Sequence, residues 1–117
     1  MRVTTDLWVS ALLRRVFGAG VVVLIGSRAG MVVAAEAAVV IDNFTFSPAE
    51  ITVKAGDTVE WVNNDFVDHT ATATSGEWDV MIVAGQSARQ EMTKPGTIKY
   101  FCRAHPDMTG TITIVNK

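Results

Sequence analysis

The chain has 117 residues, of which 49% are hydrophobic and 19% are charged, and its formal net charge is −2. That length suffices for one domain and excludes a second one of ordinary size. The acidic balance argues against a nucleic-acid partner, because nucleic-acid binding requires a basic face.

The first 37 residues differ in composition from the rest and have the features of a secretory signal. Three arginines precede the apolar run 16–25, and small residues then lead to an A-x-A-like site at 35–37. A charged start, an apolar stretch and such a site are typical of a signal peptide. We therefore predict a signal peptide over residues 1–37 and a mature domain over residues 38–117.

Other interpretations of this segment stay open. The pair Arg14-Arg15 resembles the twin-arginine export signal, which carries folded proteins. Cleavage after Ala35 also fits the small-residue rule. A retained membrane anchor is a further interpretation of the stretch 16–35, although Arg28 interrupts it and a span needs about 20 mostly apolar residues. We expect export to the periplasm, with membrane contact only through this segment if it stays uncleaved.

From residue 38 onward, apolar and polar side chains alternate along much of the chain. Ile51 and Val53 alternate with threonine and lysine, and Ile112 and Ile114 alternate with threonines. A period of two residues is typical of strands with one buried face. Turn residues interrupt the pattern roughly every 8–12 residues, which favours an all-β sandwich or barrel. The aromatic residues expected in its modest core are Phe44, Phe46, Trp61, Phe66, Trp78 and Tyr100.

One short loop near the end of the chain carries three potential metal ligands. Cys102, His105 and Met108 follow one another at intervals of three residues, so that the loop can fold around one ion. Pro106 stiffens the loop because its ring fixes its own φ angle. The chain has a single cysteine, and an odd cysteine in an exported protein indicates an intermolecular bridge, a reactive thiol or a metal ligand. The neighbouring histidine and methionine favour the metal ligand.

His69, the other of only two histidines, supplies a fourth potential ligand from a polar stretch in mid-chain. Two His, one Cys and a weak axial Met are the ligands of a blue-copper electron-transfer site. We therefore predict one copper ion that alternates between Cu(I) and Cu(II), with His69, Cys102, His105 and Met108 as its ligands.

Each of these residues also has a structural interpretation. Free cysteine is often buried and inert, methionine often fills gaps in a core, and a histidine in a polar loop is often a surface residue. Structural zinc is the main competing metal, but it takes four Cys or His ligands and this chain offers three.

These motifs resemble those of the cupredoxins, the small blue-copper proteins, and within them the amicyanin group. The resemblance covers nearly all of residues 38–117, with VKAGDTVEW at 53–61, a first histidine, and YFCxxHPxM at 100–108. The two-residue gap between His105 and Met108 is amicyanin-like. The resemblance implies a Greek-key β-sandwich of about eight strands, with copper at one end, that carries single electrons between larger redox proteins.

Two positions depart from the family pattern. Thr70 stands where family members often carry Asn after the first histidine, and a threonine hydroxyl can still hold the neighbouring loop. Ala104 stands where amicyanin-like loops tend to have Pro, and it keeps a backbone N–H that we expect to donate toward the Cys102 thiolate. A hydrogen bond to that sulfur withdraws charge from it and favours Cu(I).

The favoured function is therefore electron transfer, not enzymatic catalysis. We expect a monomer in which His105 is the exit for the electron and a redox partner docks there transiently. Asp68 and Asp107 are expected to steer a basic partner toward it. The residues expected around His105 are Ala104, Pro106 and Met81.

Three other functions stay open from the sequence. The first is copper storage or delivery without redox traffic. The second is a fragment of a copper oxidase or nitrite reductase, although a second copper would need more histidines than the chain has. The third is an adhesion-type sandwich without a metal.

Overall fold

A computed structural model of the protein describes residues 34–117. The predicted signal peptide therefore lies outside the described residues, except for positions 34–37. Across the part of the chain that is described, no helix is long and apolar enough to cross a membrane.

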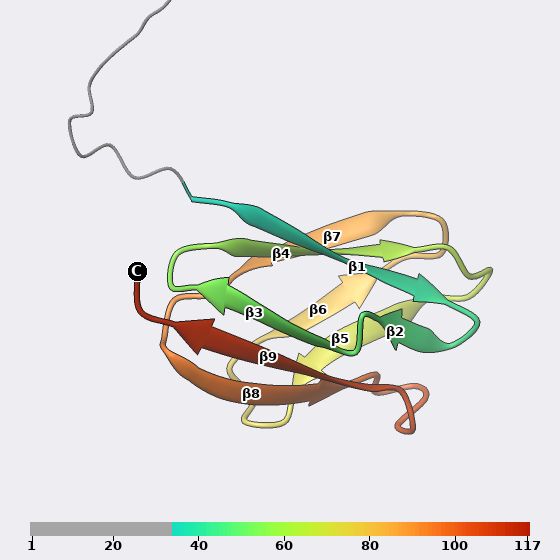
Figure 1. The fold of residues 1–117 in the computed structure, drawn as a ribbon. Helices are drawn as coiled ribbons and strands as arrows, with labels where there is room; N and C mark the ends of the chain where they lie inside the picture. The colour runs from blue at the N-terminus through green and yellow to red at the C-terminus, as the bar shows by residue number, and fades with distance from the viewer. Residues whose placement is uncertain (1–33) are drawn as a thin grey trace, which may run out of the picture. The chain divides into compact units, whose positions relative to one another are not determined.

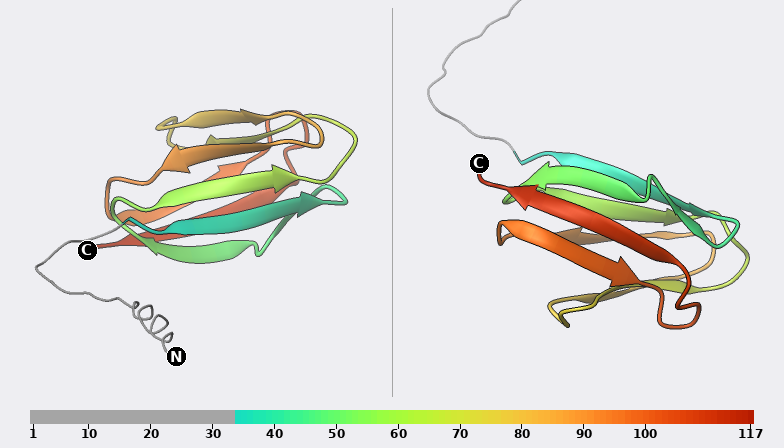
Figure 2. Two further views of the ribbon diagram at one scale, coloured as in Figure 1. Left: turned by 90° about the horizontal axis from the view of Figure 1, so that it is seen from above. Right: turned by 60° about the horizontal axis from the view of Figure 1, so that its bottom comes forward.

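Within residues 34–117 the chain forms nine strands arranged as two packed sheets (Figure 1, Figure 2). The strands are β1 (Glu36–Asp42), β2 (Thr45–Ser47), β3 (Glu50–Lys54), β4 (Thr58–Asn63), β5 (His69–Ala73), β6 (Asp79–Ile82), β7 (Ser87–Glu91), β8 (Gly96–Phe101) and β9 (Thr109–Val115). One sheet has the order β2-β1-β4-β7 and the other the order β3-β9-β8-β5-β6. The predicted all-β sandwich is confirmed, with nine strands where about eight were expected.

The core between the sheets follows the two-residue alternation of the sequence. In β4, Val59, Trp61 and Asn63 are buried, whereas the residues between them are only partly buried. In β9, Ile112 and Ile114 are buried in the same way. Full burial of an aliphatic or aromatic side chain contributes roughly 1.5–3 kcal/mol, so these inward rows hold the two sheets together.

Trp61 and Tyr100 lie at the centre of this core and join the two sheets. The indole Nε1–H of Trp61 donates to the Tyr100 hydroxyl at 3.3 Å. Burial raises the pKa of Tyr100 to about 12. Gly110 faces Tyr100 in the β8–β9 register, and a Cβ at this position would lie only 2.4 Å from the tyrosine ring. Glycine therefore lets β9 start beside a large core residue directly after the loop 102–108.

The expectation that Phe44 and Phe66 belong to the core is wrong. Phe66 is 100% exposed and Phe44 is 45% exposed, whereas the other aromatic residues expected in the core are buried. Phe44 lies in the turn between β1 and β2, and Phe66 lies in the segment between β4 and β5. Turns do not follow the strand alternation, so the hydrophobic character of these residues did not predict which way they face.

The pairing of β5 with β8 decides where the predicted ligands meet. The two strands run antiparallel, with Thr72 opposite Phe101 and Ala73 opposite Tyr100. The start of β5, where His69 lies, is therefore beside the end of β8, where the loop with Cys102 begins. Residues separated by 33 positions in the chain come together at one end of the five-stranded sheet.

Candidate metal centre

Cys102 follows β8 directly and is fully buried. Two backbone hydrogen bonds fold the chain after it into consecutive tight turns, from His105 N–H to the Cys102 carbonyl at 3.2 Å and from Met108 N–H to the His105 carbonyl at 2.8 Å. The Cys102 N–H in turn donates to the Met108 carbonyl at 3.1 Å. The loop is therefore closed on itself by its own backbone, and the three-residue spacing returns the chain to Cys102.

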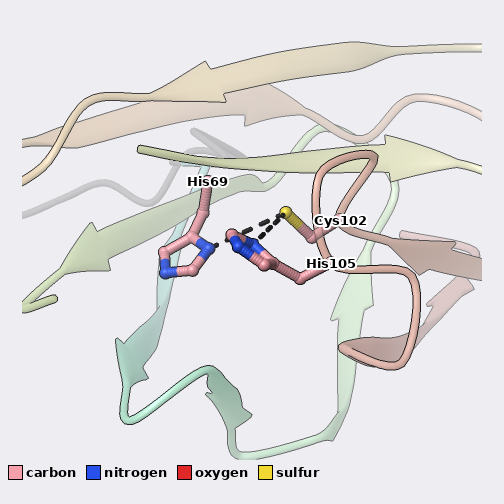
Figure 3. Close-up of side chains that lie close together, drawn as sticks. All are labelled: His69, Cys102 and His105. Atoms are coloured by element: carbon pink, nitrogen blue, oxygen red, sulfur yellow. Dashed lines mark hydrogen bonds between the residues drawn. The ribbon is translucent and has the colours of Figure 1, made fainter. Parts of the chain in front are cut away.

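His69, Cys102 and His105 point toward one another from two parts of the chain (Figure 3). The Cys102 Sγ lies 3.7 Å from His69 Nδ1 and 3.6 Å from His105 Nδ1. All three potential ligand atoms lie within 4.8 Å of one another. His69 is fully buried, and His105 is partly exposed. The geometry thus brings together three of the four predicted ligands.

These separations fit one transition-metal ion. Nitrogen and sulfur ligands lie about 2.0 and 2.3 Å from a first-row ion, so in a trigonal site the two ligand atoms are about 3.7 Å apart. The measured N–S distances of 3.7 and 3.6 Å match that value. One thiolate and two imidazoles in this arrangement, with a thioether nearby in the sequence, form the donor set preferred by copper over zinc.

The surroundings of Cys102 favour its ionised, metal-binding form. Burial by itself raises the pKa of the thiol, but the Thr70 and Ala104 amides and the two imidazoles that face the sulfur together lower it to about 6. The Thr70 N–H donates to the sulfur at 3.3 Å. The sequence had suggested only the Ala104 amide, and the Thr70 amide was missed because its approach depends on the β5–β8 pairing.

Met108 is buried beside this group, and its backbone takes part in two of the three loop hydrogen bonds described above. Its burial agrees with a ligand that faces the interior. A core methionine would be buried as well, so its thioether as the axial ligand stays a prediction.

The Thr70 hydroxyl holds the loop, as the sequence suggested. The Arg103 N–H donates to Thr70 Oγ1 at 2.9 Å. Thr72 Oγ1 donates to the Asp79 carboxylate at 2.6 Å, so the 2.9 Å contact between the two threonines uses the proton of Thr70. The Arg103 Nε–H also donates to Asp79, at 3.1 Å, and closes the ring of bonds. A directed chain of hydrogen bonds therefore ties the residue after Cys102 to β5 and β6.

Asn63 shapes the segment that leads to His69, and the sequence analysis did not identify it. Its side-chain amide donates to the carbonyls of Val67 at 2.9 Å and Ile82 at 3.0 Å. Its Oδ1 accepts from the Asp65 N–H at 2.9 Å. Asn63 takes the inward position of β4 that follows Val59 and Trp61. A polar residue in this inward row could have indicated a buried hydrogen-bonding role, because buried polar groups need partners.

Phe44 and Asp65 also touch the site and were missed. The Phe44 ring lies edge-on to His69 and His105, with centroid distances of 5.2 and 4.7 Å. The Asp65 carboxylate lies 2.8 Å from His69 Nε2. No metal-binding motif includes these two residues, and only the folded chain brings them to the imidazoles.

Comparison with known proteins gives one consistent family. The cupredoxin-like domain family matches residues 17–114. Plastocyanin from Scenedesmus fuscus is 37% identical over 84 residues, which cover 59% of this chain and 85% of that protein. Amicyanin from Paracoccus denitrificans is 30% identical over 88 residues, covering 68% of this chain and 67% of that protein. The crystal structure of amicyanin from Paracoccus versutus matches with a TM-score of 0.60 at 31% identity, covering 67% and 79% of the two chains.

We predict that Thr72→Val loosens the loop after Cys102, because Thr70 then loses the acceptor that orients its hydroxyl. The Arg103 amide should exchange with solvent roughly tenfold faster in the metal-free protein, which is the effect of losing about one hydrogen bond. Hydrogen exchange followed by NMR measures this. Thr113→Val, a half-buried position on β9, is the matched control and should leave Arg103 unchanged. Equal exchange of the Arg103 amide in both variants would refute the role of this chain of hydrogen bonds.

Proposed function

The chain belongs to the cupredoxin family, and from that membership we propose that it is an electron-transfer protein with one copper ion at His69, Cys102 and His105. Met108 is proposed as the axial ligand. The observation that supports this most directly is the placement of two imidazole nitrogens 3.6 and 3.7 Å from a buried sulfur of lowered pKa.

The residues of the chain prepare the site for a change of one charge. A bound copper ion alternates between Cu(I) and Cu(II) and thereby supplies the one-electron step. Cys102 and His69 are fully buried, so water cannot reach these two side chains. The hydrogen-bond chain from Arg103 to Asp79 and the backbone bonds within the loop hold the ligands in place. A site held in this way needs little rearrangement when the electron arrives or leaves.

A carrier fits this site better than copper storage or delivery, and better than an enzyme. Delivery requires ligand exchange with a recipient, and two of the three gathered ligands are fully buried. A copper enzyme with a second metal would need more imidazoles, and both histidines of the chain are already at this site.

The electron route and the docking surface are proposed at His105, the partly exposed ligand. Three segments that adjoin the site carry exposed apolar side chains. They are the turn with Phe44, the loop that ends at His69, and the residues on both sides of Ile82, which pairs with His69. Met81 is 52% exposed, in agreement with its expected place near the exit, and Ala104 and Pro106 are exposed too. A redox protein that docks here transiently would cover the following side chains: Phe44, Phe66, Val67, Met81 and Val83.

Location, oligomeric state and attraction of a partner are also part of the proposal. We place the protein in the periplasm as a monomer, with Asp68 and Asp107 on the exposed surface near the ligands available to attract a basic partner. The signal segment is proposed to direct export, and the membrane is contacted only through that segment if it stays uncleaved.

We expect metal-free protein to take up one equivalent of Cu(II) and to develop an intense visible absorption band that a reductant bleaches reversibly. Cys102→Ser should abolish the band, because the thiolate that gives it is gone. Met108→Leu should keep the band and raise the reduction potential, because the loss of a weak axial donor disfavours Cu(II). Spectra and voltammetry of the three proteins measure this. Binding of Cu(I) alone, without the band, would support copper delivery instead.

We predict that Phe66→Asp slows electron exchange between oxidised and reduced copies of the protein by about tenfold, because loss of a large apolar side chain that docking buries costs more than 1 kcal/mol and a factor of ten is about 1.4 kcal/mol. NMR line broadening of mixed samples measures the rate. Val115→Asp introduces the same charge at an exposed apolar residue at the far end of β9 and serves as the control. Equal rates in the two variants would show that the proposed surface is not used.

The sequence predicts a signal peptide over residues 1–37, with cleavage after Ala35 as the alternative; we propose the alternative, so that the exported protein begins at Glu36. Glu36 is the first residue of β1, lies opposite Thr58 in the β1–β4 register, and forms an ion pair with Arg89. Cleavage after Ala37 would remove that pair. Intact mass spectrometry of periplasmic protein measures the end; a start at Ala38 contradicts the expectation, and full-length protein in the membrane fraction identifies a retained anchor.

A further inference from the structure

The Asp65 carboxylate contacts the proposed ligand His69, and its side chain is only 10% exposed. It accepts three hydrogen bonds in the segment between β4 and β5. Its Oδ1 accepts from the Asn43 N–H at 2.7 Å, and its Oδ2 accepts from the Phe44 N–H at 2.9 Å. Oδ2 also lies 2.8 Å from His69 Nε2. One carboxylate thus joins the β1–β2 turn to the buried imidazole.

The contact with Asp65 determines which nitrogen of His69 is free. Oδ1 accepts the Asn43 N–H and Oδ2 accepts the Phe44 N–H, so both oxygens act as acceptors, as in a carboxylate. An ionised carboxylate only accepts hydrogen bonds, so the proton of the imidazole lies on Nε2. The lone pair of Nδ1 then faces Cys102 Sγ, 3.7 Å away. Asp65 therefore presents His69 in the form that binds a metal through Nδ1.

The same carboxylate holds an unusual turn. Asn43 and Phe44 have φ angles of +53° and +58°, in the left-handed region that residues other than glycine rarely adopt. Asp65 accepts the N–H groups of both residues and so stabilises this conformation. The conformation places the Phe44 ring at 86° to both imidazoles. The ring covers the two histidines on the side of the turn, and the carboxylate keeps it there.

We propose that Asp65 is a positioning residue of the metal centre, which orients His69, seats Phe44 against both imidazoles, and lowers the reduction potential through its charge. The last effect arises because a carboxylate bonded to a ligating imidazole makes the imidazole a stronger donor and favours the more highly charged metal ion. This inference rests on the proposed electron-transfer function for the potential, but the part that concerns the turn holds without a metal.

The test compares Asp65→Asn with Asp42→Asn. Both variants lose one negative charge and keep the side-chain shape, but Asp42 is exposed at the end of β1, one residue before the turn. In metal-free protein, at least one of the Asn43 and Phe44 amides should exchange about tenfold faster in Asp65→Asn, since one of the two oxygens that accept them has become an NH₂ that cannot accept. Both amides should exchange at the wild-type rate in Asp42→Asn.

The second readout is the reduction potential of the copper-loaded proteins. Asp65→Asn should raise it by about 59 mV, which corresponds to a tenfold change in the ratio of Cu(I) to Cu(II) affinity, and that factor is the lower end for loss of such a partner. In reduced wild-type protein the His69 Nε2–H proton should be visible by NMR and slow to exchange, because the Asp65 carboxylate accepts it.

These measurements distinguish failure of the Asp65 proposal from failure of the proposed function. Equal potentials in Asp65→Asn and Asp42→Asn would show that Asp65 has no more than a structural role and would overturn the proposal. Unchanged exchange of the two turn amides would overturn its claim on Phe44. A wild-type protein that forms no copper site refutes the proposed function, whereas the amide exchange still tests the turn. If Asp65→Asn does not fold, the slowly exchanging Nε2–H proton of wild-type His69 decides the orientation.

Discussion

The structure depends on one constraint, the burial of a sulfur that must carry a negative charge. A thiolate in an apolar interior is costly unless hydrogen-bond donors or a metal compensate it. Cys102 is fully buried, yet its pKa falls to about 6 because the Thr70 and Ala104 amides and two imidazoles face it from β5 and from the loop after β8. The antiparallel pairing of β5 with β8 makes this possible, since it brings the Thr70 amide and the His69 ring to the end of β8.

The compensation for this charge is organised in successive layers. The imidazoles and the Thr70 amide contact the sulfur directly. Behind them, Thr70 and Thr72 connect the loop to Asp79, and Asp65 connects His69 to the β1–β2 turn. Each of these partners is itself hydrogen-bonded, and such networks are more rigid than their separate bonds. The same arrangement that stabilises a buried thiolate would therefore also keep the proposed ligands in place during a one-electron change.

The surface near the site has the opposite character. Phe66 and Phe44 were expected in the core from their hydrophobicity, yet both lie in connecting segments and are exposed. Exposed aromatic residues beside a partly exposed proposed ligand suit brief contacts with a partner, because docking then buries apolar surface without removing charged groups from water. The sandwich places its large buried aromatic residues, Trp61 and Tyr100, behind the site and leaves other aromatic residues in front of it.

The sequence by itself determined the fold class and the chemistry. Two-residue alternation predicted strands, and Cys102, His105 and His69 predicted a mixed sulfur and nitrogen site, because strand patterns are local and ligand identity is a property of residue type. The tertiary structure alone decided how the site is supported. Asp65 and Phe44 reach the imidazoles only because a loop and a turn from different strands meet there. Such contacts depend on strand pairing across long separations, and no local pattern encodes which residues those pairings bring together.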